Sequence, residues 1–586
     1  MMSLPEGSNA SPQLAPPPGL LERAISWRHD DPDEATGAEL DALLASASSG
    51  DVAAGAQLAD RFDRFLEFGT AGLRGAMGAG PNRMNRAVVI RASAGLTAYL
   101  RETSPDPLVV IGFDARHNSE VFARDTAAVV LAAGGRAMVL PRPLPTPVLA
   151  FAIRWLGADA GVMVTASHNP ARDNGYKVYL RDGSQIVTPA DSEIAAHIAR
   201  VGLVADVPRA NSGWTTLNDD LLEAYLDAAA AVVSPSGPRA LRVVHTALHG
   251  VGGDVVTAAF ARAGFSAPIV VQSQAEPDPE FPTVRFPNPE EPGAIDAALA
   301  LAARVNPDLV LANDPDADRC AVAVPDPARA AETPTTTNPG WRMLSGDEVG
   351  ALLGAHILAR GVAADAVFAN SIVSSTLLAA MAADAGIRHT ETLTGFKWIS
   401  RVAGLTYGYE EALGYCVDPR QVRDKDGISA ALMLAEMAAG LRAQGRSLSD
   451  VLDDLSNRYG VHATESFAVR VEDLSLIGRL MARLRVGPPT EIGGVPVARI
   501  DDLAEGSDQL PPTDGLRYLL KDASRVIVRP SGTEPKLKVY LEVIVAVGTP
   551  SHSGVETPAG LVAARAEATG RLLRLGVSMR ALTKAG

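Results

Sequence analysis

The chain has 586 residues, which is too long for a single hydrophobic core and predicts several domains. Its formal net charge of −15 argues against nonspecific binding to nucleic acid or to anionic membranes, so a bound phosphate must be held by locally gathered Arg and Lys. The two cysteines, Cys320 and Cys416, belong to no CxxC pair, which argues against a disulfide framework or structural zinc and favours a reducing, cytoplasmic setting.

The N-terminal residues 1–19 are polar and rich in proline, and we expect them to form a disordered tail. The tail has no apolar segment of signal-peptide length, and no apolar run in the chain is long enough to span a bilayer. We therefore interpret the protein as neither secreted nor embedded in a membrane. Residues 20–65 have a helical pattern and are expected to cover the first domain.

Three segments share a pattern of strand, turn, helix, glycine and second strand. Their first strands are expected at 108–116, 241–246 and 366–370. Short apolar runs that alternate with helical stretches indicate parallel strands with crossover helices. The sequence therefore predicts an α/β fold in which three related α/β domains contain mixed sheets.

The last part of the chain has a different pattern. Residues 466–471 and 538–545 alternate between apolar and polar side chains, as half-buried antiparallel strands do. This pattern predicts a smaller C-terminal α+β domain, and we expect the four domains to surround a central cleft. The expected limits are 1–216, 217–338, 339–462 and 463–586, with a connecting helix at 217–230 and a Pro/Thr-rich insertion of unassigned role at 325–339.

An apolar strand near residues 161–164 leads into a polar turn at 165–170 that contains Ser167. Ser167 is the candidate for the residue that carries the chemistry, although Ser-His-Asn-Pro is also an ordinary turn sequence. His168 follows directly. Neighbouring side chains on an extended backbone point to opposite sides, which disfavours a Ser-His nucleophile pair.

Asp314, Asp316 and Asp318 alternate along a segment that we expect to be an extended loop, so their carboxylates can converge on one hard cation. An EF-hand calcium loop is excluded, because Arg319 and Pro325 stand where that loop needs glycine and glutamate. Three carboxylates leave coordination positions open, which suits Mg²⁺ bound together with a phosphate oxygen. The alternative is an acidic surface loop without a metal.

Two later loops carry groups suited to sugars and phosphates. Glu410 and Glu411 lie between glycines in the segment 408–414, where carboxylates can accept hydrogen bonds from sugar hydroxyls. The segment 529–536 combines a glycine turn, two hydroxyls and flanking cations, a set that can bind a phosphate dianion. It is not a Walker P-loop, because no Gly-Lys dipeptide closes it. Taken singly, the first loop is also typical of solvated surface acids and the second of a tight turn between strands.

In this order the serine turn, the aspartate loop, the glutamate loop and the 529–536 loop resemble the four active-site loops of the α-D-phosphohexomutases, the phosphoglucomutase and phosphomannomutase family. The resemblance extends from about Phe68 to Tyr540. It implies a phosphorylated Ser167 that shares Mg²⁺ with the three aspartates. The implied metal ligands are Ser167, Asp314, Asp316 and Asp318.

The resemblance also assigns further roles by motif. The implied catalytic residues are Ser167, Lys177, Arg74 and Arg319, with Lys177 a candidate to assist proton transfer. Residues 114–116 follow the first repeat's strand and are expected to position the serine turn. The implied substrate-binding residues are Thr70, His168, Thr394, Lys397, Glu410, Glu411, Lys425, Arg529, Ser531, Gly532, Thr533 and Lys536.

The glutamate loop has Ala412 where the commoner form of the motif has a serine, so the chain departs from that form at one hydroxyl contact. With the segment 424–427, this form is similar to the branch that contains phosphoglucomutase 2 and phosphopentomutase. The resemblance implies a phosphosugar mutase that interconverts hexose 1-phosphate and hexose 6-phosphate through phosphoserine and a sugar bisphosphate, with glucose first and mannose second. A phosphopentomutase acting on ribose or deoxyribose phosphates, a catalytically silent sugar-phosphate-binding relative, and a phosphatase stay open as alternatives.

The implied cofactors are Mg²⁺ and a sugar 1,6-bisphosphate as activator, and the implied partner is a small-molecule phosphosugar. No nucleic-acid or membrane partner is expected, and the protein is expected to be a monomer or a dimer. The cleft must close to keep water from phosphoserine, and we expect the last domain to move as the gate.

Overall fold

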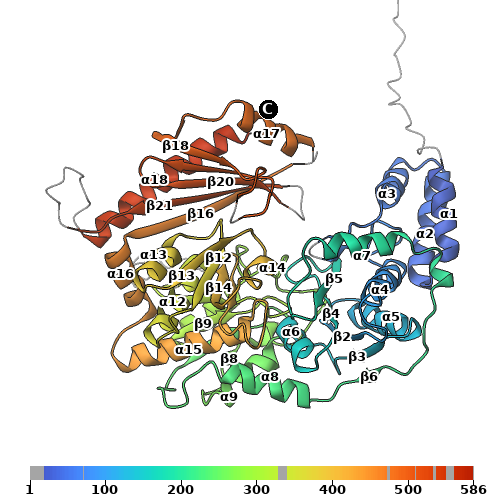
Figure 1. The fold of residues 1–586 in the computed structure, drawn as a ribbon, viewed down its shortest axis with the longest axis horizontal. Coiled ribbons are helices and arrows are strands. Elements are labelled where there is room, and N and C mark those ends of the chain that lie inside the picture. The colour runs from blue at the N-terminus through green and yellow to red at the C-terminus, as the bar shows by residue number, and fades with distance from the viewer. Residues whose placement is uncertain are drawn as a thin grey trace, which may run out of the picture.

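The computed structural model describes residues 19–69, 72–326, 340–471, 475–507, 510–531, 536–548 and 560–584. The chain forms three α/β domains followed by an α+β domain, which lies on the third (Figure 1). This arrangement confirms the predicted fold class. The predicted tail, up to residue 18, and residues 327–339 of the predicted insertion lie outside the described residues.

Three helices precede the first sheet, as the helical pattern predicted. The side chain of Asp33 caps the second helix by accepting a hydrogen bond from the Ala35 amide, and Asp51 caps the third in the same way. Leu40, Leu58 and other apolar side chains form a small core between them. The helices are α1 (Leu20–Asp30), α2 (Glu34–Ser48) and α3 (Val52–Phe62).

The sheet of the first domain is mixed, in the order β1-β5-β4-β2-β3-β6. The central strand β2 is buried along its whole length, which accounts for its continuous apolar run. Its strands are β1 (Leu73–Ala76), β2 (Leu108–Phe113), β3 (Arg136–Val139), β4 (Ala160–Val164), β5 (Asp173–Leu180) and β6 (Thr215–Thr216). Its helices are α4 (Arg86–Leu100), α5 (Ser119–Ala132), α6 (Thr146–Trp155), α7 (Ala190–Ala199) and the short 3₁₀-helix η1 (Val204–Asp206).

The second domain follows α8 (Asp220–Ala230) and has the sheet order β11-β10-β9-β7-β8. The pair β7 and β8 is parallel, as the repeat predicted, and β10 is antiparallel to both of its neighbours, β9 and β11. The strands are β7 (Val243–Thr246), β8 (Ile269–Val270), β9 (Leu309–Ala312), β10 (Ala321–Pro325) and β11 (Trp341–Met343). The helices are α9 (Gly253–Arg262), α10 (Asp296–Val305) and the 3₁₀-helix η2 (Gln272–Gln274).

The third domain has the sheet order β13-β12-β14-β15, in which β12 is parallel to both of its neighbours. Its strands are β12 (Val367–Ser371), β13 (Arg388–Thr392), β14 (Leu405–Glu410) and β15 (Gly414–Cys416). Its helices are α12 (Gly346–Ala359), α13 (Leu377–Asp384), α14 (Phe396–Ile399), α15 (Gly427–Ala443) and α16 (Leu448–Tyr459).

The fourth domain is an antiparallel sheet in the order β16-β21-β20-β19-β18-β17, with two helices. The two strands predicted from alternation pair with each other, with Ser466 opposite Tyr540. The strands are β16 (Val461–Arg470), β17 (Glu491–Ile492), β18 (Val495–Asp502), β19 (Leu516–Leu520), β20 (Arg525–Pro530) and β21 (Lys536–Val545), and the helices are α17 (Ser475–Val486) and α18 (Leu561–Leu582).

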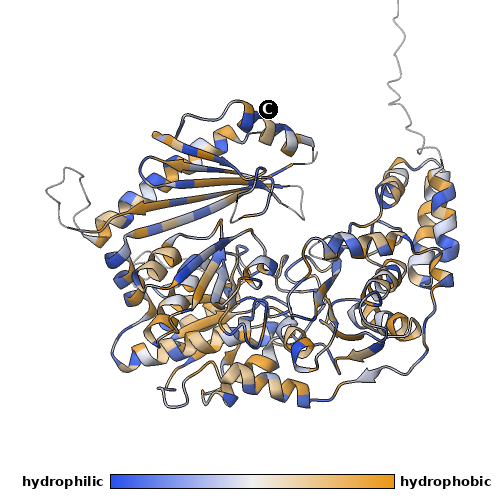
Figure 2. Cartoon of the chain, viewed as in Figure 1, coloured by the Kyte–Doolittle hydropathy of each residue, from blue (hydrophilic) through white to orange (hydrophobic). Residues whose placement is uncertain are grey.

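One hydrophobic core runs through the first three domains, and apolar residues lie mainly in the strands and in the helices that pack on them (Figure 2). Leu149 of α6, Tyr225 of α8, Val310 of β9 and Leu432 of α15 belong to this single core. The fourth domain has its own core between its sheet and the helices α17 and α18. The first three domains therefore form one packed body, and the fourth is a separate one.

The contact between the third and fourth domains combines an apolar cluster with a buried ion pair. Ile372 and Leu393 of the third domain pack with Ile527 and other residues of the fourth. Beside them, the Arg525 guanidinium lies 2.8 Å from Glu542 and donates to the Ile372 carbonyl at 2.9 Å. The Glu542 carboxylate also accepts hydrogen bonds from the Ser375 hydroxyl at 2.8 Å and the Thr376 amide at 2.7 Å, both from the third domain.

Glu542→Gln is expected to destabilise this contact in a pH-dependent way. Burial alone would raise the pKa of Glu542, but Arg525 and the hydrogen bonds lower it to about 2. Because the folded-state pKa is lower than the unfolded value, the carboxylate stabilises the fold above the unfolded pKa, and this contribution is lost as the pH falls toward the folded pKa. We expect the variant to lose about 3 kcal/mol near pH 7, and the difference from the wild type to shrink below about pH 4.5.

Urea unfolding measures the free energy of unfolding of each variant. Hydrogen exchange in β20 and β21 then shows whether the loss lies at this contact. Asp453→Asn is the matched control, because Asp453 pairs with Arg565 on the surface, where both side chains are almost half exposed. This control is expected to cost less than about 1 kcal/mol. Equal losses in the two variants, or a loss in Glu542→Gln that does not change with pH, would contradict the prediction.

Candidate active site

The serine turn leaves β4 and carries Ser167 into a buried position. Ser167 has a left-handed backbone, with φ 50°, and its side chain is almost completely buried. The Thr165 hydroxyl accepts a hydrogen bond from the Ser167 amide at 2.9 Å and donates to Asp114 at 2.6 Å. The Ser167 hydroxyl itself donates to Asp314 Oδ2 at 2.7 Å. The serine therefore meets the aspartate loop of the second domain directly.

The prediction that Ser167 and His168 point to opposite sides was wrong. The Ser167 Oγ and His168 Nδ1 atoms lie 3.3 Å apart, because the left-handed backbone at Ser167 turns the two side chains toward each other. Loss of hydration and the nearby charges of Arg319 and Arg74 hold the pKa of His168 well below its usual value. Among the described residues no carboxylate hydrogen-bonds to His168, so the pair lacks the orienting group of a hydrolase triad.

Arg116 holds the serine turn from inside. Its guanidinium donates to four carbonyl oxygens of the turn: Ser167 and Asn169 at 2.6 Å each, Pro170 at 2.8 Å and Asp173 at 3.1 Å. The guanidinium also lies 4.9 Å from the ring centre of Phe281 in the second domain. These contacts agree with the expectation that residues 114–116 position the serine turn.

The three aspartates converge, but the loop is not extended as predicted. Ala317 has a left-handed backbone, with φ 53°, and its amide donates to the Asp314 carbonyl at 2.8 Å. The segment is thus a turn, and it brings one carboxylate oxygen of each aspartate within 4.8 Å of the others. All three side chains are fully buried, which excludes the alternative of an acidic surface loop.

Lys177 and the N-terminal end of α6 compensate the negative charge of the buried aspartates. The Lys177 ammonium lies 2.6 Å from Asp316 and 3.0 Å from Asp318. Asp316 also accepts from the Thr146 hydroxyl at 2.7 Å, and its carbonyl accepts from the Thr146 amide at the first turn of α6. Burial would raise the pKa of Asp316, but Lys177 and these hydrogen bonds hold it far below its usual value. The partial positive charge at the start of α6 favours the same carboxylate.

The donor set of the aspartate loop fits a small divalent cation. The Oδ1 atoms of Asp316 and Asp318 are buried and have no hydrogen-bond partner, so oxygen ligands are left over after the lysine contacts. Burial, together with the charges of Asp316 and Asp318, holds the pKa of Asp314 well above its usual value. Buried carboxylates without partners are costly unless a cation neutralises them. Three carboxylate oxygens beside the Ser167 hydroxyl can bind such a metal.

The glutamate loop of the third domain packs directly on the aspartate loop. The Cys320 amide donates to the Leu413 carbonyl at 3.1 Å, which joins the two loops through their backbones. The Glu411 carboxylate accepts from the hydroxyls of Ser371 at 3.0 Å and Ser374 at 3.1 Å, which fixes its orientation. Burial raises the pKa of Glu410 above its usual value.

The fourth domain brings cations toward these acids. Arg529 is the last residue but one of β20 and is paired in register with Lys538 of β21, and the Ser531 amide donates to the Lys536 carbonyl at 2.8 Å. Burial lowers the pKa of Lys538. The positive charges of Lys536 and Arg529 lower it further, whereas the negative charge of Glu411 raises it. Burial likewise lowers the pKa of Lys397 in α14 to about 8. The charge of Arg529 also lowers this pKa, and the charge of Glu410 raises it. The charges of the glutamate loop and of Arg529 therefore act on the same two lysines.

The remaining predicted residues fall into two groups. Arg74 contacts the serine turn, donating to Asn169 at 3.4 Å, and Lys425 lies 3.2 Å from Asp318. Arg319 lies 3.7 Å from Asp318, and Thr394 is half-buried just before α14. Outside the described residues lie Thr70, Gly532 and Thr533.

Sequence reasoning missed several residues that the structure places at the site. Thr146 and Thr165 position the aspartate loop and the serine turn, and nothing in the local sequence signals their contacts. Lys538 had a readable signal, because alternation along β21 places it on the same face as Lys536.

The chain matches the models of all four phosphoglucomutase/phosphomannomutase domains in order. The three alpha/beta/alpha domains I, II and III match residues 66–204, 223–327 and 345–459, and the C-terminal domain matches residues 469–543.

No helix among the described residues is long and apolar enough to cross a membrane.

Individual proteins are similar over nearly the same length. A Haemophilus influenzae protein named "probable phosphomannomutase" is 47% identical over 464 residues, covering 78% of this chain and 93% of that protein. The Homo sapiens phosphopentomutase is 35% identical, covering 93% and 94%. A solved phosphoglucomutase/phosphomannomutase family protein from Burkholderia thailandensis has the same fold, with a TM-score of 0.64, 20% identity, and coverage of 89% of this chain and 98% of that chain.

Arg116→Lys is expected to loosen the serine turn. A lysine ammonium cannot reach four carbonyls at once, so most of the hydrogen bonds that hold residues 167–173 are lost. Hydrogen exchange of this segment, measured by mass spectrometry, should become faster by about tenfold or more. The matched control is Arg172→Lys, since the Arg172 side chain is 82% exposed and pairs only loosely with Asp173. Unchanged protection of the turn in Arg116→Lys would contradict the assignment.

Proposed function

The chain belongs to the phosphoglucomutase/phosphomannomutase family and is a phosphosugar mutase, and we propose that it interconverts hexose 1-phosphate and hexose 6-phosphate, with glucose preferred and mannose second. The observation that carries the proposal is the 2.7 Å hydrogen bond from the Ser167 hydroxyl to Asp314, within a set of three buried carboxylates. This contact supports the proposal, because the Ser167 oxygen would act as nucleophile next to carboxylates that could hold a divalent cation.

Phospho-Ser167 is the proposed phosphoryl donor. The free hydroxyl oxygen of a sugar monophosphate bonds to phosphorus as the bond from phosphorus to Ser167 Oγ breaks, and Oγ gains a proton while the sugar hydroxyl loses one. The resulting sugar 1,6-bisphosphate reorients in the site, and Ser167 Oγ takes the other phosphoryl group by the reverse exchange. The same bisphosphate would act as the activator that first phosphorylates the enzyme.

The surrounding residues bind and orient the reacting groups. Asp314, Asp316, Asp318 and phosphorylated Ser167 would hold Mg²⁺, which supplies Lewis-acid stabilisation of the phosphoryl group when bound. Lys177 and Arg319, at the edge of the carboxylate set, are placed to neutralise charge on that group.

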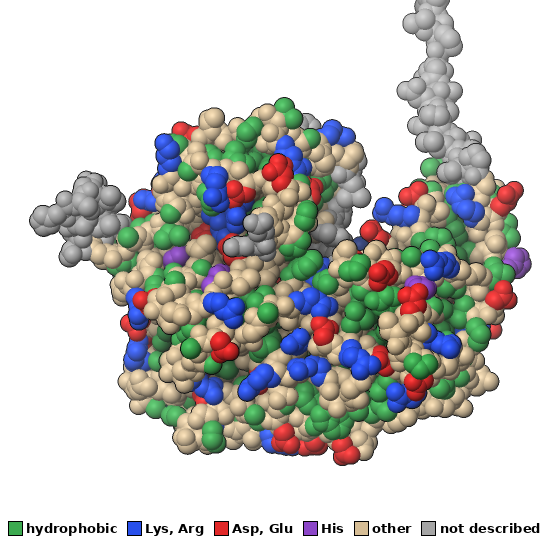
Figure 3. Space-filling view, in the orientation of Figure 1, with side chains coloured by type: hydrophobic (Ala, Val, Ile, Leu, Met, Phe, Trp, Pro, Cys, Tyr) green, Lys and Arg blue, Asp and Glu red, His purple; other side chains and the backbone are tan. Residues whose placement is uncertain are grey.

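The far end of the sugar would contact the third and fourth domains. We assign the sugar hydroxyls to Glu410 and Glu411, and the phosphate that is not reacting to Arg529, Ser531 and the following loop. Figure 3 shows the surface hollowed between the fourth domain and the first. Movement of the fourth domain over this hollow would exclude water from phosphoserine.

A pentose phosphate is the alternative substrate, ranked third after the glucose and mannose phosphates. Ala412 leaves the glutamate loop without the hydroxyl that a serine supplies in the commoner form of the motif. The Homo sapiens relative that matches 93% of this chain is named phosphopentomutase. We also propose a reducing, cytoplasmic setting, since Cys320 and Cys416 are both free and buried.

Turnover of glucose, mannose and ribose 1-phosphates, measured with Mg²⁺ and a trace of sugar bisphosphate, tests the proposal. The hexose phosphates should isomerise fastest, and Ser167→Ala should lower kcat by roughly 10⁴-fold or more while still binding sugar phosphate. Ser192→Ala, at an exposed serine of α7, is the matched control and should keep full turnover.

The outcomes separate the candidates. Faster turnover of ribose 1-phosphate would assign the protein to pentose phosphates. Release of inorganic phosphate without isomerisation would indicate a phosphatase. Unchanged isomerisation by Ser167→Ala would overturn the phosphoserine mechanism.

A further inference from the structure

Lys425 belongs to the third domain, and its side chain contacts the aspartate loop of the second domain. Lys425 is 6% exposed, and its ammonium lies 3.2 Å from Asp318 and 3.4 Å from Asp424. The ammonium also lies 5.7 Å from the ring centre of Phe396 in α14. A lysine has a long flexible side chain, so a fixed ammonium position needs fixed neighbours.

The residue before Lys425 is held by the first domain. Asp424 Oδ2 accepts hydrogen bonds from the Tyr179 hydroxyl and from Gln185 Nε2, each at 2.7 Å. Tyr179 lies two residues after Lys177 on β5, so both side chains are on the same face of the sheet and reach the same site. Burial and the charge of Asp424 hold the pKa of Tyr179 well above its usual value, so its hydroxyl acts as the donor.

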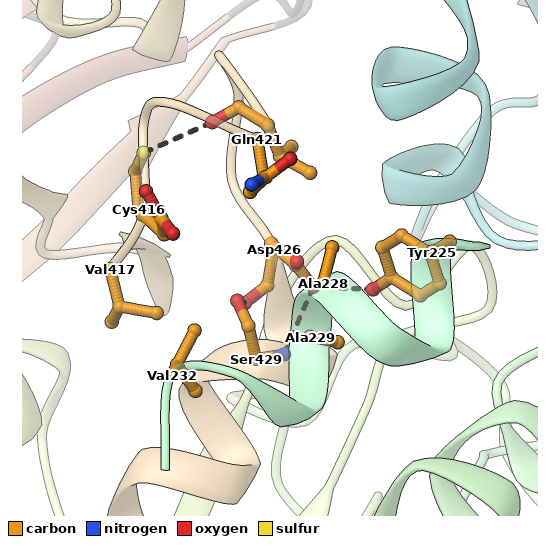
Figure 4. Close-up of a pocket in the computed structure, with 11 residues that line it drawn as sticks. Tyr225, Ala228, Ala229, Val232, Cys416, Val417, Gln421, Asp426 and Ser429 are labelled. Atoms are coloured by element: carbon orange, nitrogen blue, oxygen red, sulfur yellow. Dashed lines mark hydrogen bonds between the residues drawn. The ribbon is translucent and has the colours of Figure 1, made fainter. Parts of the chain in front are cut away.

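The residue after Lys425 is held by the helix that joins the first two domains. Asp426 Oδ1 accepts from the Tyr225 hydroxyl of α8 at 2.9 Å, and from the amides of Ile428 at 3.0 Å and Ser429 at 3.1 Å at the start of α15. Figure 4 shows Tyr225 directed at Asp426 in the lining of a small cavity of about 10 Å³, a volume with room for about one water molecule. The packing therefore leaves this carboxylate little freedom.

We propose that Tyr179 and Tyr225 are positioning residues, which fix the Lys425 ammonium beside Asp318 by holding the two aspartates on either side of it. Lys425 comes from the third domain, whereas Tyr179 belongs to the first domain and Tyr225 to the helix after it. The cation therefore reaches its place only when the three domains are docked. This inference rests on the proposed function, because Lys425 is the group through which the tyrosines would act on the phosphosugar.

Tyr179→Phe and Tyr225→Phe each remove one hydroxyl and leave the ring. Each is expected to lower kcat by about tenfold or more, as loss of a supporting hydrogen bond does at other sites, with a smaller change in KM. Tyr459→Phe is the matched control, since the Tyr459 hydroxyl donates to Asp384 on the surface, and it should keep wild-type turnover.

A double-mutant cycle distinguishes positioning from general stability. In a Lys425→Met background, Tyr179→Phe should lower kcat by less than about twofold further, because the group it positions is gone. The same factor in both backgrounds would mean that Tyr179 acts on stability alone and would overturn the inference. The affinity for glucose 1-phosphate, measured by calorimetry, gives a second readout. Tyr179→Phe should lower this affinity in the wild-type background and leave it unchanged in the Lys425→Met background.

The failure of this inference is distinguishable from failure of the proposed function. A wild-type enzyme that isomerises phosphosugars, combined with normal turnover in both tyrosine variants, would overturn the inference alone. A wild-type protein that isomerises no phosphosugar would overturn the proposed function, and the binding cycle would still decide whether the tyrosines act through Lys425.

Discussion

The burial of three carboxylates at one point is the constraint on which the rest of this structure depends. Asp314, Asp316 and Asp318 are fully buried, and isolated ionised carboxylates in such surroundings would each cost several kcal/mol. The compensation comes from other domains: Lys177 and the start of α6 from the first, and Lys425 from the third. A charged centre built from three domains requires those domains to be docked accurately. The single hydrophobic core that runs through all three meets this requirement.

The fourth domain has a different relation to that centre. It has a separate core, and it joins the third domain through a small apolar cluster and the buried pair of Arg525 and Glu542. It supplies cations such as Arg529 and Lys538, and none of its described residues forms an ion pair with the carboxylate cluster. The molecule thus divides into one packed body that contains the carboxylate cluster and a second body to which we assign the distal phosphate. This division suits a reaction in which an intermediate must turn around without leaving.

Local sequence patterns were sufficient for the fold but not for the geometry of the site. The continuous apolar run of β2 and the alternation of β21 mark buried parallel and antiparallel strands, and both interpretations were confirmed. The left-handed backbone at Ser167 could not be read from the sequence, because non-glycine residues rarely adopt it, and the predicted separation from His168 failed for that reason. The bond from Tyr179 to Asp424 joins residues 245 positions apart, which no local pattern reveals.

In the proposed mechanism, Ser167 carries a phosphoryl group between the two positions of one sugar. The most direct test is to incubate the protein with a sugar 1,6-bisphosphate and Mg²⁺, locate the added phosphoryl group by peptide mass spectrometry, and then add sugar monophosphate. We expect one phosphoryl group on Ser167, which is transferred to the monophosphate as bisphosphate forms. A phosphoryl group on another residue, or one that leaves Ser167 only to water, would contradict it.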